Sequence, residues 1–342
     1  MSFRTFHKFC LIVSLASLGA IFAKREAPAQ VTGTTTLRAA AMLFSPLPAP
    51  ELFSPADIAR VELLATDNHW PMPDEFKPWP MDEQGQPIIT TRQVDELWQT
   101  LHRGQTSPRR LRDMFRGDLR RIMALNPNLN FSDLQPDDRV LVWQRDTDAI
   151  SRSVGSANGG RLVDAEPMPP GDNYIVLFPH RSFGTYYAIS EIVRALDAYK
   201  IRYPDAAPLL VGDLSFRTGR RIQPHKSHQA GRDVDITYPR ITEPVNYRRF
   251  HPISRRNLDA ERSLWLLKSF IDGGQVEYIF VDQRHQYTLA KEARKQGAPA
   301  EWIRKVFQYP HHKGAALVRH ARGHAKHFHV RFKCQETDRH CR

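Results

Sequence analysis

Apolar residues in the second half of the chain follow two spacings, one typical of strands and one typical of helices. Continuous or alternating apolar runs predict strands at 173–178, 209–214, 276–281 and 323–332. Apolar residues three and four positions apart predict helices at 186–199 and 259–271. We therefore expect residues 173–336 to form an α+β domain with a mostly antiparallel sheet flanked by helices.

A smaller compact unit precedes this domain, over residues 97–144. Its pattern predicts a strand, two short helices and a final strand, at 97–102, 107–115, 117–125 and 139–143. This β-α-α-β order, together with residues 125–129 and 134–140, resembles a lysin-motif domain, which binds the glycan of peptidoglycan or chitin. Residues 104–108 depart from the usual Gly-Asp-Thr-Leu of that motif, which bears on glycan affinity more than on the fold. A small structural helix pair is the alternative.

The start of the chain has the layout of a secretory signal. Residues 1–8 carry Arg4 and Lys8, and an apolar run over 9–23 ends in small residues. Because this run is short for a membrane span, we expect residues 1–23 to be removed during export, with an uncleaved anchor as the alternative. The mature protein is then expected in the periplasm, without membrane attachment.

Composition separates the two predicted units from the segments around them. Residues 24–96 are rich in proline and poor in periodicity, and we interpret them as a proline-rich linker or poorly defined region. Residues 145–172 are rich in glycine and serine and contain a Pro-Pro pair, which predicts a flexible linker. Residues 337–342 form a short tail after the α+β domain.

Charge and cysteine content narrow the choice of partner and compartment. The formal net charge of +12 predicts an anionic partner. Nucleic acid fits poorly, because the chain starts like an exported protein and has neither an arginine-rich helix nor zinc-finger spacing. An anionic cell-wall polymer fits better. After signal removal only Cys334 and Cys341 remain, and in an oxidising compartment they can form a disulfide that closes the tail.

Two segments far apart in the sequence carry the side chains of a candidate metal site. The first, residues 220–236, contains two histidines and two aspartates, namely His225, His228, Asp233 and Asp235. The second, residues 323–332, alternates so that His327 and His329 lie on one face of a strand. Hydrolytic zinc sites use such imidazole and carboxylate ligands, with three from the protein and a fourth position open to water.

Three runs, in this order, resemble the penicillin-insensitive murein endopeptidase family. They are Val-Gly-Asp-Leu-Ser at 211–215, His-Lys-Ser-His-Gln-Ala-Gly-Arg-Asp-Val-Asp-Ile at 225–236, and the segment at 323–332. This family belongs with the zinc peptidases that include lysostaphin, D-Ala-D-Ala peptidases and hedgehog domains. The resemblance covers residues 172–334, about half of the chain.

The resemblance implies a role for each of these side chains. The implied zinc ligands are His228, Asp235 and His329. His327 would act as the general base or stabilise the tetrahedral oxyanion, since the chain has no His-Glu-x-x-His helix. His225 and His324 also match family site positions. His225 would bind a second metal ion, and His324 would contact a metal ligand and not the metal itself. Asp233 either competes with Asp235 as the carboxylate ligand or orients a ligand imidazole. One zinc ion is expected, and a second fits the same resemblance.

The implied function is hydrolysis of amide bonds in the peptide cross-links of peptidoglycan, of the D-alanyl-meso-diaminopimelyl type. Peptidoglycan is then the partner, and the unit at 97–144 would hold the enzyme on the cell wall. One alternative is a non-catalytic peptidoglycan-binding protein with a structural zinc site, against which the presence of His327 argues. Another is an iron oxygenase, because two histidines and one carboxylate also bind iron in that class.

Overall fold

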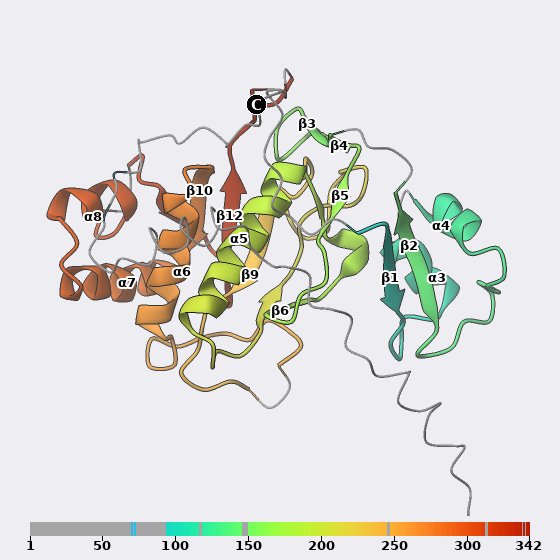
Figure 1. Ribbon diagram of the computed structural model, residues 1–342, viewed down its shortest axis with the longest axis horizontal. Coiled ribbons are helices and arrows are strands. Elements are labelled where there is room, and N and C mark those ends of the chain that lie inside the picture. The colour runs from blue at the N-terminus through green and yellow to red at the C-terminus, as the bar shows by residue number, and fades with distance from the viewer. Residues whose placement is uncertain are drawn as a thin grey trace, which may run out of the picture. The chain divides into compact units, whose positions relative to one another are not determined.

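A computed structural model describes residues 70, 72, 94–115, 118–145, 150–244, 247–311, 314–336, 338 and 340–342 (Figure 1). The expected signal at 1–23 and nearly all of the proline-rich region at 24–96 lie outside these residues. Within that region, Trp70 and Met72 pack against the main apolar core, and the Trp70 ring meets Trp302 edge-on with centroids 4.7 Å apart. No helix in the described part of the chain is long and apolar enough to cross a membrane.

A six-stranded sheet forms the centre of the second half of the chain. Its strands, in spatial order, are β11 (Val318–His320), β10 (Val276–Val281), β12 (His327–Phe332), β9 (Asp233–Thr237), β8 (Leu209–Val211) and β6 (Tyr174–Val176). The three central pairings are antiparallel, whereas the outermost pairs, β10 with β11 and β8 with β6, run parallel. The predicted α+β class with a mostly antiparallel sheet is confirmed.

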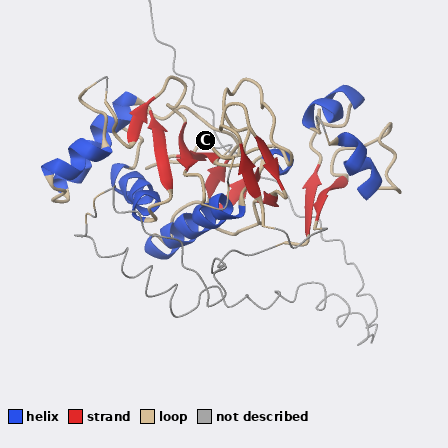
Figure 2. Ribbon diagram, turned by 90° about the horizontal axis from the view of Figure 1, so that it is seen from above, coloured by secondary structure: helices blue, strands red, loops and turns tan. Residues whose placement is uncertain are grey.

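Two long helices pack on this sheet. α5 (Tyr186–Arg202) begins after Thr185 and α6 (Ala260–Asp272) begins after Asp259, and each of these residues accepts a hydrogen bond from a backbone N–H of the first turn. Their apolar side chains join those of the sheet in one large cluster. Seen from above in Figure 2, helices lie along one side of the strands and mostly loops along the other.

Two further helices, α7 (Gln283–Lys295) and α8 (Ala300–Val306), follow β10 in the chain. The sequence pattern does not indicate them, because the apolar positions of α7 are sparse and α8 has only seven residues. The buried aliphatic side chains of α7 are Leu289, Ala290 and Ala293. Most of its other residues are charged or polar, so packing against the rest of the fold, more than periodicity, accounts for this element.

Residues 94–145, called the module below, form a small unit with the β-α-α-β order expected from the sequence. Its elements are β1 (Glu96–Thr100), α3 (Pro108–Met114), α4 (Leu119–Leu125) and β2 (Arg139–Gln144). β1 and β2 pair antiparallel. Asn126 ties α4 to β2, because its side-chain amide donates to the carbonyls of Ile122 and Leu141 and its Oδ1 accepts the Leu141 backbone N–H.

The segment expected to be a flexible linker, residues 145–172, is folded in its described part. The elements here and just beyond are β3 (Arg152–Val154), β4 (Arg161–Val163), β5 (Glu166–Pro167), the 3₁₀ turn η1 (Pro179–Arg181) and β7 (Phe183–Gly184). Leu162, Ala165 and Phe183 belong to the same apolar cluster as the core of the module. The structure therefore differs from a hinge, because these short strands join two packed units rather than tether them.

Two ionic contacts strengthen the same junction. The Arg217 guanidinium donates two hydrogen bonds to the Asp118 carboxylate, at 2.6 and 2.9 Å. Arg145 holds both carboxylate oxygens of Glu166, at 3.0 and 2.9 Å. Bidentate pairs of this kind fix orientation as well as distance.

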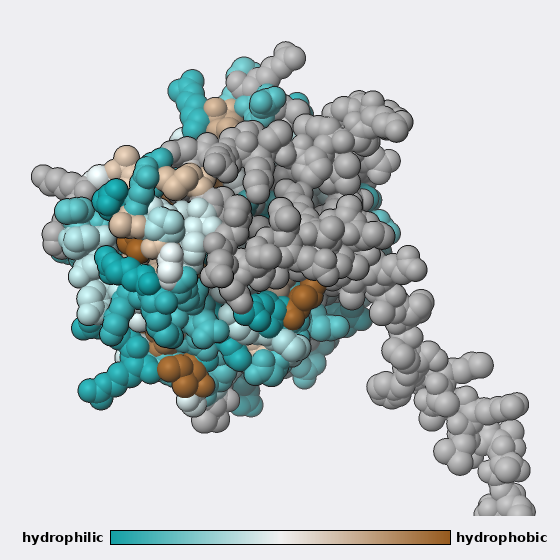
Figure 3. All heavy atoms as spheres, turned by 60° about the vertical axis from the view of Figure 1, so that its left-hand side comes forward, coloured by the Kyte–Doolittle hydropathy of each residue, from teal (hydrophilic) through white to brown (hydrophobic). Residues whose placement is uncertain are grey.

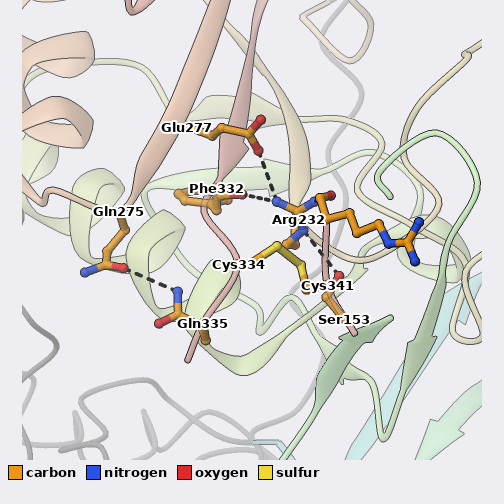
Figure 4. Close-up of a disulfide and its surroundings, with 9 residues drawn as sticks. Ser153, Arg232, Gln275, Glu277, Phe332, Cys334, Gln335 and Cys341 are labelled. Carbon is orange, nitrogen blue, oxygen red and sulfur yellow. Dashed lines mark hydrogen bonds and ion pairs between the residues drawn. A yellow bond between two sulfur atoms is a disulfide. The ribbon is translucent and has the colours of Figure 1, made fainter. Parts of the chain in front are cut away.

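A disulfide joins Cys334 and Cys341 near the end of the chain, a pairing that the sequence allowed but did not decide (Figure 4). The buried side chain of Arg232, just before β9, lies beside it. Its guanidinium donates to the carbonyl of Phe332 at 2.6 Å and to that of Arg342 at 2.8 Å. The last residue of the chain is therefore bonded to the segment that leads into β9.

The outer surface is mostly hydrophilic on the face shown in Figure 3, where hydrophobic residues appear in small groups. Among the described residues, the large hydrophobic side chains that remain exposed are Trp98, Met123, Ile150, Ile201, Ile241 and Tyr287. They are spread along the chain. Such a surface suits a polar partner better than a broad apolar one.

Candidate metal centre

Two neighbouring strands present the predicted site residues on one face of the sheet. β9 and β12 pair with Asp235 opposite His329 and Thr237 opposite His327. Because side chains alternate between the faces of a strand, every second residue enters the apolar core. Those core residues are Val234, Ile236, Phe328 and Val330. The aspartates of β9 and the histidines of β12 lie on the opposite face and are nevertheless buried.

The loop before β9 brings His228 to Asp235. His228 has a left-handed backbone with φ 64°, as does Gly231 with φ 70°. This conformation is uncommon for a residue other than glycine, and such strain clusters at functional sites. Asp233 holds the turn, because its Oδ2 accepts the His228 backbone N–H at 2.9 Å. The His228 ring donates from Nδ1 to the Leu214 carbonyl at 3.0 Å, which leaves Nε2 3.5 Å from Asp235 Oδ1.

His225 completes a group of three potential ligands. His225, His228 and Asp235 each offer one atom, and these atoms lie within 4.8 Å of one another. Asp213 orients the His225 ring, because its Oδ2 lies 3.2 Å from Nε2 and leaves Nδ1 3.9 Å from Asp235 Oδ2. Arg181 Nε lies 2.9 Å from the other Asp213 oxygen. The structure thus brings His225, expected at a second metal ion, into the same group as His228.

His329, the third expected ligand, lies beside this group with both ring nitrogens facing carboxylates. Nδ1 is 3.0 Å from Asp235 Oδ1, and Nε2 is 2.9 Å from Asp233 Oδ1. Asp233 Oδ1 also accepts a hydrogen bond from Arg331 Nε at 2.7 Å. Of the two roles considered for Asp233, its contacts match the orientation of an imidazole. With Nε2 held by Asp233, Nδ1 is the nitrogen that faces Asp235.

His327 borders the group and keeps one nitrogen without a partner. Its Nε2 lies 3.6 Å from Asp235 Oδ2, while its buried Nδ1 has no hydrogen-bond partner in the described part of the chain. Phe250 stacks on the ring, with centroids 4.9 Å apart and planes at 27°. Gly212 makes room for Phe250, because a Cβ there would lie 2.5 Å from the phenyl ring. The His324 ring is 5.1 Å from His327, and its Nδ1 faces backbone carbonyls of its own loop.

Burial and charge act in opposite directions on the titratable groups of the site. Burial favours a raised pKa for the Asp235 carboxyl, but the neighbouring imidazoles of His327 and His228 hold that pKa well below its ordinary value. Burial favours a lowered pKa for His329, but the carboxylate of Asp233, and then Asp235, raise it to about 9. Burial lowers the pKa of His327, against the attraction of Asp235. His329 therefore keeps its proton while His327 is neutral.

The donor set fits a divalent cation. Arg331 pairs with Asp233 and Arg181 with Asp213, which leaves Asp235 among imidazoles as the buried carboxylate whose charge a cation would balance. Nε2 of His228 is buried and has no hydrogen-bond partner among the described residues, as a nitrogen reserved for a ligand bond would be. Imidazole nitrogen and carboxylate oxygen are the ligands that zinc prefers.

Three neighbours of the site are absent from the sequence-based assignment. Asp213 lies in the run at 211–215, so that run is the signal for it, although its contact with His225 follows only from the fold. Arg181 and Phe250 lie outside all three runs. The sequence alone gives no signal for either residue, because Arg181 contacts the site through Asp213 and Phe250 contacts it only by stacking on the His327 ring.

Comparison with known proteins places this site in a family. The model of the penicillin-insensitive murein endopeptidase family matches residues 153–342. Curated proteins of that name include one from Klebsiella pneumoniae, 26% identical over 221 residues, and one from Yersinia enterocolitica, 28% identical over 218 residues. Each match covers 58% of this chain and 73% of the relative. Since the matched region is more than half of the chain and contains both strands and the loop that build the site, the chain belongs to the penicillin-insensitive murein endopeptidase family.

Proposed function

We propose that this protein is an exported, zinc-dependent endopeptidase that hydrolyses the D-alanyl-meso-diaminopimelyl cross-links of peptidoglycan. Membership of a murein endopeptidase family supports the substrate class. The observation that carries the proposal is the group of His225, His228 and Asp235, whose potential ligand atoms lie within 4.8 Å of one another. Beside it stands His327, with a buried nitrogen that has no hydrogen-bond partner among the described residues.

The side chains of the site divide the work of amide hydrolysis. A zinc ion bound at this group would polarise the scissile carbonyl and activate a water molecule for attack. His327, whose Nε2 lies 3.6 Å from Asp235 Oδ2, accepts a proton from the water and returns it to the leaving amine, because burial keeps its ring neutral. Asp233 holds His329 from behind, and Asp213 does the same for His225. Phe250 keeps the plane of the His327 ring in place.

The N-terminal part of the chain completes the proposal. Residues 1–23 direct export to the periplasm, where peptidoglycan lies. The module contacts the glycan, in keeping with its β-α-α-β order and its resemblance to a lysin motif. The net charge of +12 favours the anionic wall polymer.

Digestion of purified cross-linked muropeptide dimers, with mass analysis of the products, tests this proposal. We expect monomers from cleavage at the D-alanyl-meso-diaminopimelyl bond, loss of cleavage with a chelator, and recovery with zinc. His311→Ala, a change at a surface residue away from the site, serves as the matched histidine control. Intact dimers after zinc reconstitution would instead indicate a peptidoglycan-binding protein with a structural metal. Recovery only with ferrous iron and oxygen would indicate an oxygenase.

A further inference from the structure

A groove of about 480 Å³ lies between the module and the peptidase domain, residues 153–342. Besides His180, the charged and aromatic side chains that line it are Arg110 and Asp113 from α3, and Phe178, Arg181, Phe216 and Arg221 from the peptidase domain. Because α3 lies outside the region matched by the family model, the groove is a feature of this two-part chain and is not given by family membership.

The two walls of the groove are held together by direct contacts. His180, which lines the groove, is buried, and its Nδ1 lies 2.8 Å from Oε1 of Gln99 on β1. Its ring also meets Phe115, at the end of α3, edge-on with centroids 5.8 Å apart. The ion pair of Asp118 with Arg217 and the shared apolar cluster add to this contact. The groove is therefore a built surface and not a gap between independent units.

Two residues that line the groove contact the surroundings of His225, one of the three potential metal ligands. Arg221 Nε donates to the backbone carbonyl of His225 at 3.2 Å. Arg181, on the same wall, pairs with Asp213, which in turn orients the His225 ring. A molecule lying in the groove would thus extend toward the carboxylate and imidazoles at which hydrolysis is proposed.

The charge of the lining indicates what the groove binds. Three guanidinium groups and one carboxylate, that of Asp113, line the groove. Asp213 offsets the charge of Arg181. The side chains of Arg110 and Arg221 are exposed. Guanidinium groups bind carboxylates through paired, charge-assisted hydrogen bonds. The half-buried ring of Phe178 adds apolar surface for the carbon atoms of a ligand.

We propose that this groove binds a carboxylate-bearing stem peptide of the substrate, so that the module is part of the substrate-binding surface. The inference rests on the proposed function and specifies which part of the substrate the module recognises. A neutral glycan strand has no negative charge to pair with the arginines, so the groove binds the carboxylates of the substrate and not its sugars.

Direct binding tests the proposal without cleavage. The probe is a soluble muropeptide dimer, compared with the same dimer whose free carboxylates are converted to carboxamides, and its Kd is measured by calorimetry on the His327→Ala protein. We expect Arg110→Gln to weaken binding of the carboxylate form about three- to tenfold, as for a partly exposed charge pair. Arg109→Gln, an exposed neighbour on α3 outside the groove, should leave Kd unchanged. Chelator-treated wild-type protein gives a second measurement.

The comparison of the two probes identifies the contact. If Arg110 reads a carboxylate, Arg110→Gln should have little further effect on binding of the carboxamide form. Equal loss for both probes, or equal Kd values for the Arg109 and Arg110 variants, would overturn the proposal. Hydrolysis of the dimer by the wild-type protein is scored separately. If the wild-type protein hydrolyses the dimer but Arg110→Gln leaves Kd unchanged, only the groove proposal is contradicted. If the protein binds the dimer through Arg110 but does not hydrolyse it, only the proposed function is contradicted.

Discussion

His327 and His329 share one strand face, yet their rings meet different surroundings. Both nitrogens of His329 face carboxylates, so the ring is fixed and carries a proton in the absence of an ion. His327 is packed against Phe250 and keeps one nitrogen without a partner among the described residues. Under the proposed function, neighbouring groups more than residue type would separate His329, which holds the metal ion, from His327, which transfers the proton.

Alanine substitution should separate these two roles. His329→Ala removes a nitrogen that faces Asp235 and should lower zinc content and activity together. His327→Ala should keep near-stoichiometric zinc but lose activity by ~10²–10⁴-fold, the usual effect of removing a positioned acid-base or oxyanion group. Zinc content by atomic absorption and turnover of muropeptide dimers check both. Loss of zinc in His327→Ala with retention in His329→Ala would reverse the assignment.

Asp233 should matter for stability as much as for catalysis. Its carboxylate is buried and accepts from His329, Arg331 and the His228 backbone N–H. Asp233→Asn leaves the Arg331 charge without its partner, so we expect the free energy of unfolding to fall by about 3–5 kcal/mol. Glu277→Gln, which removes a half-exposed partner of Arg232, should cost about 1 kcal/mol or less. Denaturant unfolding of both proteins measures the difference, and similar losses would contradict it.

Elements with their own sequence pattern agree closely with the structure. The helices expected at 186–199 and 259–271 correspond to α5 and α6, and the strand expected at 276–281 is β10. The alternation at 323–332 places His327 and His329 on one face before any fold is known. α7, α8 and the strands β3, β4, β5 and β7 were not predicted, because packing and strand pairing, more than a pattern of their own, stabilise them.

The metal group shows the same limit. The types of its ligands follow from two short segments, but the position of His225 depends on Asp213 and on a left-handed turn at His228. Neither the contact with Asp213 nor the left-handed turn can be predicted from the spacing of residues in the sequence. The resemblance therefore supplies candidate residues, and the fold determines which atoms face one another.

The contact between Gln99 of β1 and His180 of η1 should make the stability of the protein depend on pH. Burial, with a smaller contribution from the Arg181 charge, lowers the pKa of His180 from 6.5 to about 3. The unfolded chain then binds more protons than the folded one between these pH values, so stability falls as pH decreases from about 6.5 toward 3. His180→Asn, which can keep the bond to Gln99, should flatten this dependence. Unfolding midpoints measured from pH 7 to pH 4 check it, and parallel curves for the two proteins would exclude the role of His180.

At the scale of the whole molecule, the module and the peptidase domain share an apolar cluster and two bidentate ion pairs. A tethered module would melt by itself. We instead expect one calorimetric transition for the intact protein, because separating the two parts would expose Leu162 and Phe183 to water. Asp118→Ala, which breaks the pair with Arg217, should lower the midpoint of that transition by a few degrees. Two separate transitions in the intact protein would show that the module folds independently.

The order of the strands along the chain has a consequence for synthesis. β12 is the last strand to be made, yet it lies between β10 and β9 in the sheet, and the final residue is bonded to Arg232. Until β12 has left the ribosome, the rest of the sheet can exist only as two separate halves, β11 with β10 and β9 with β8 and β6. Asp235 lies on β9 in one half, whereas His329 lies on β12 and belongs to neither half. A nascent chain therefore holds the candidate metal site only after β12 has been made, and under the proposed function hydrolysis would begin only then.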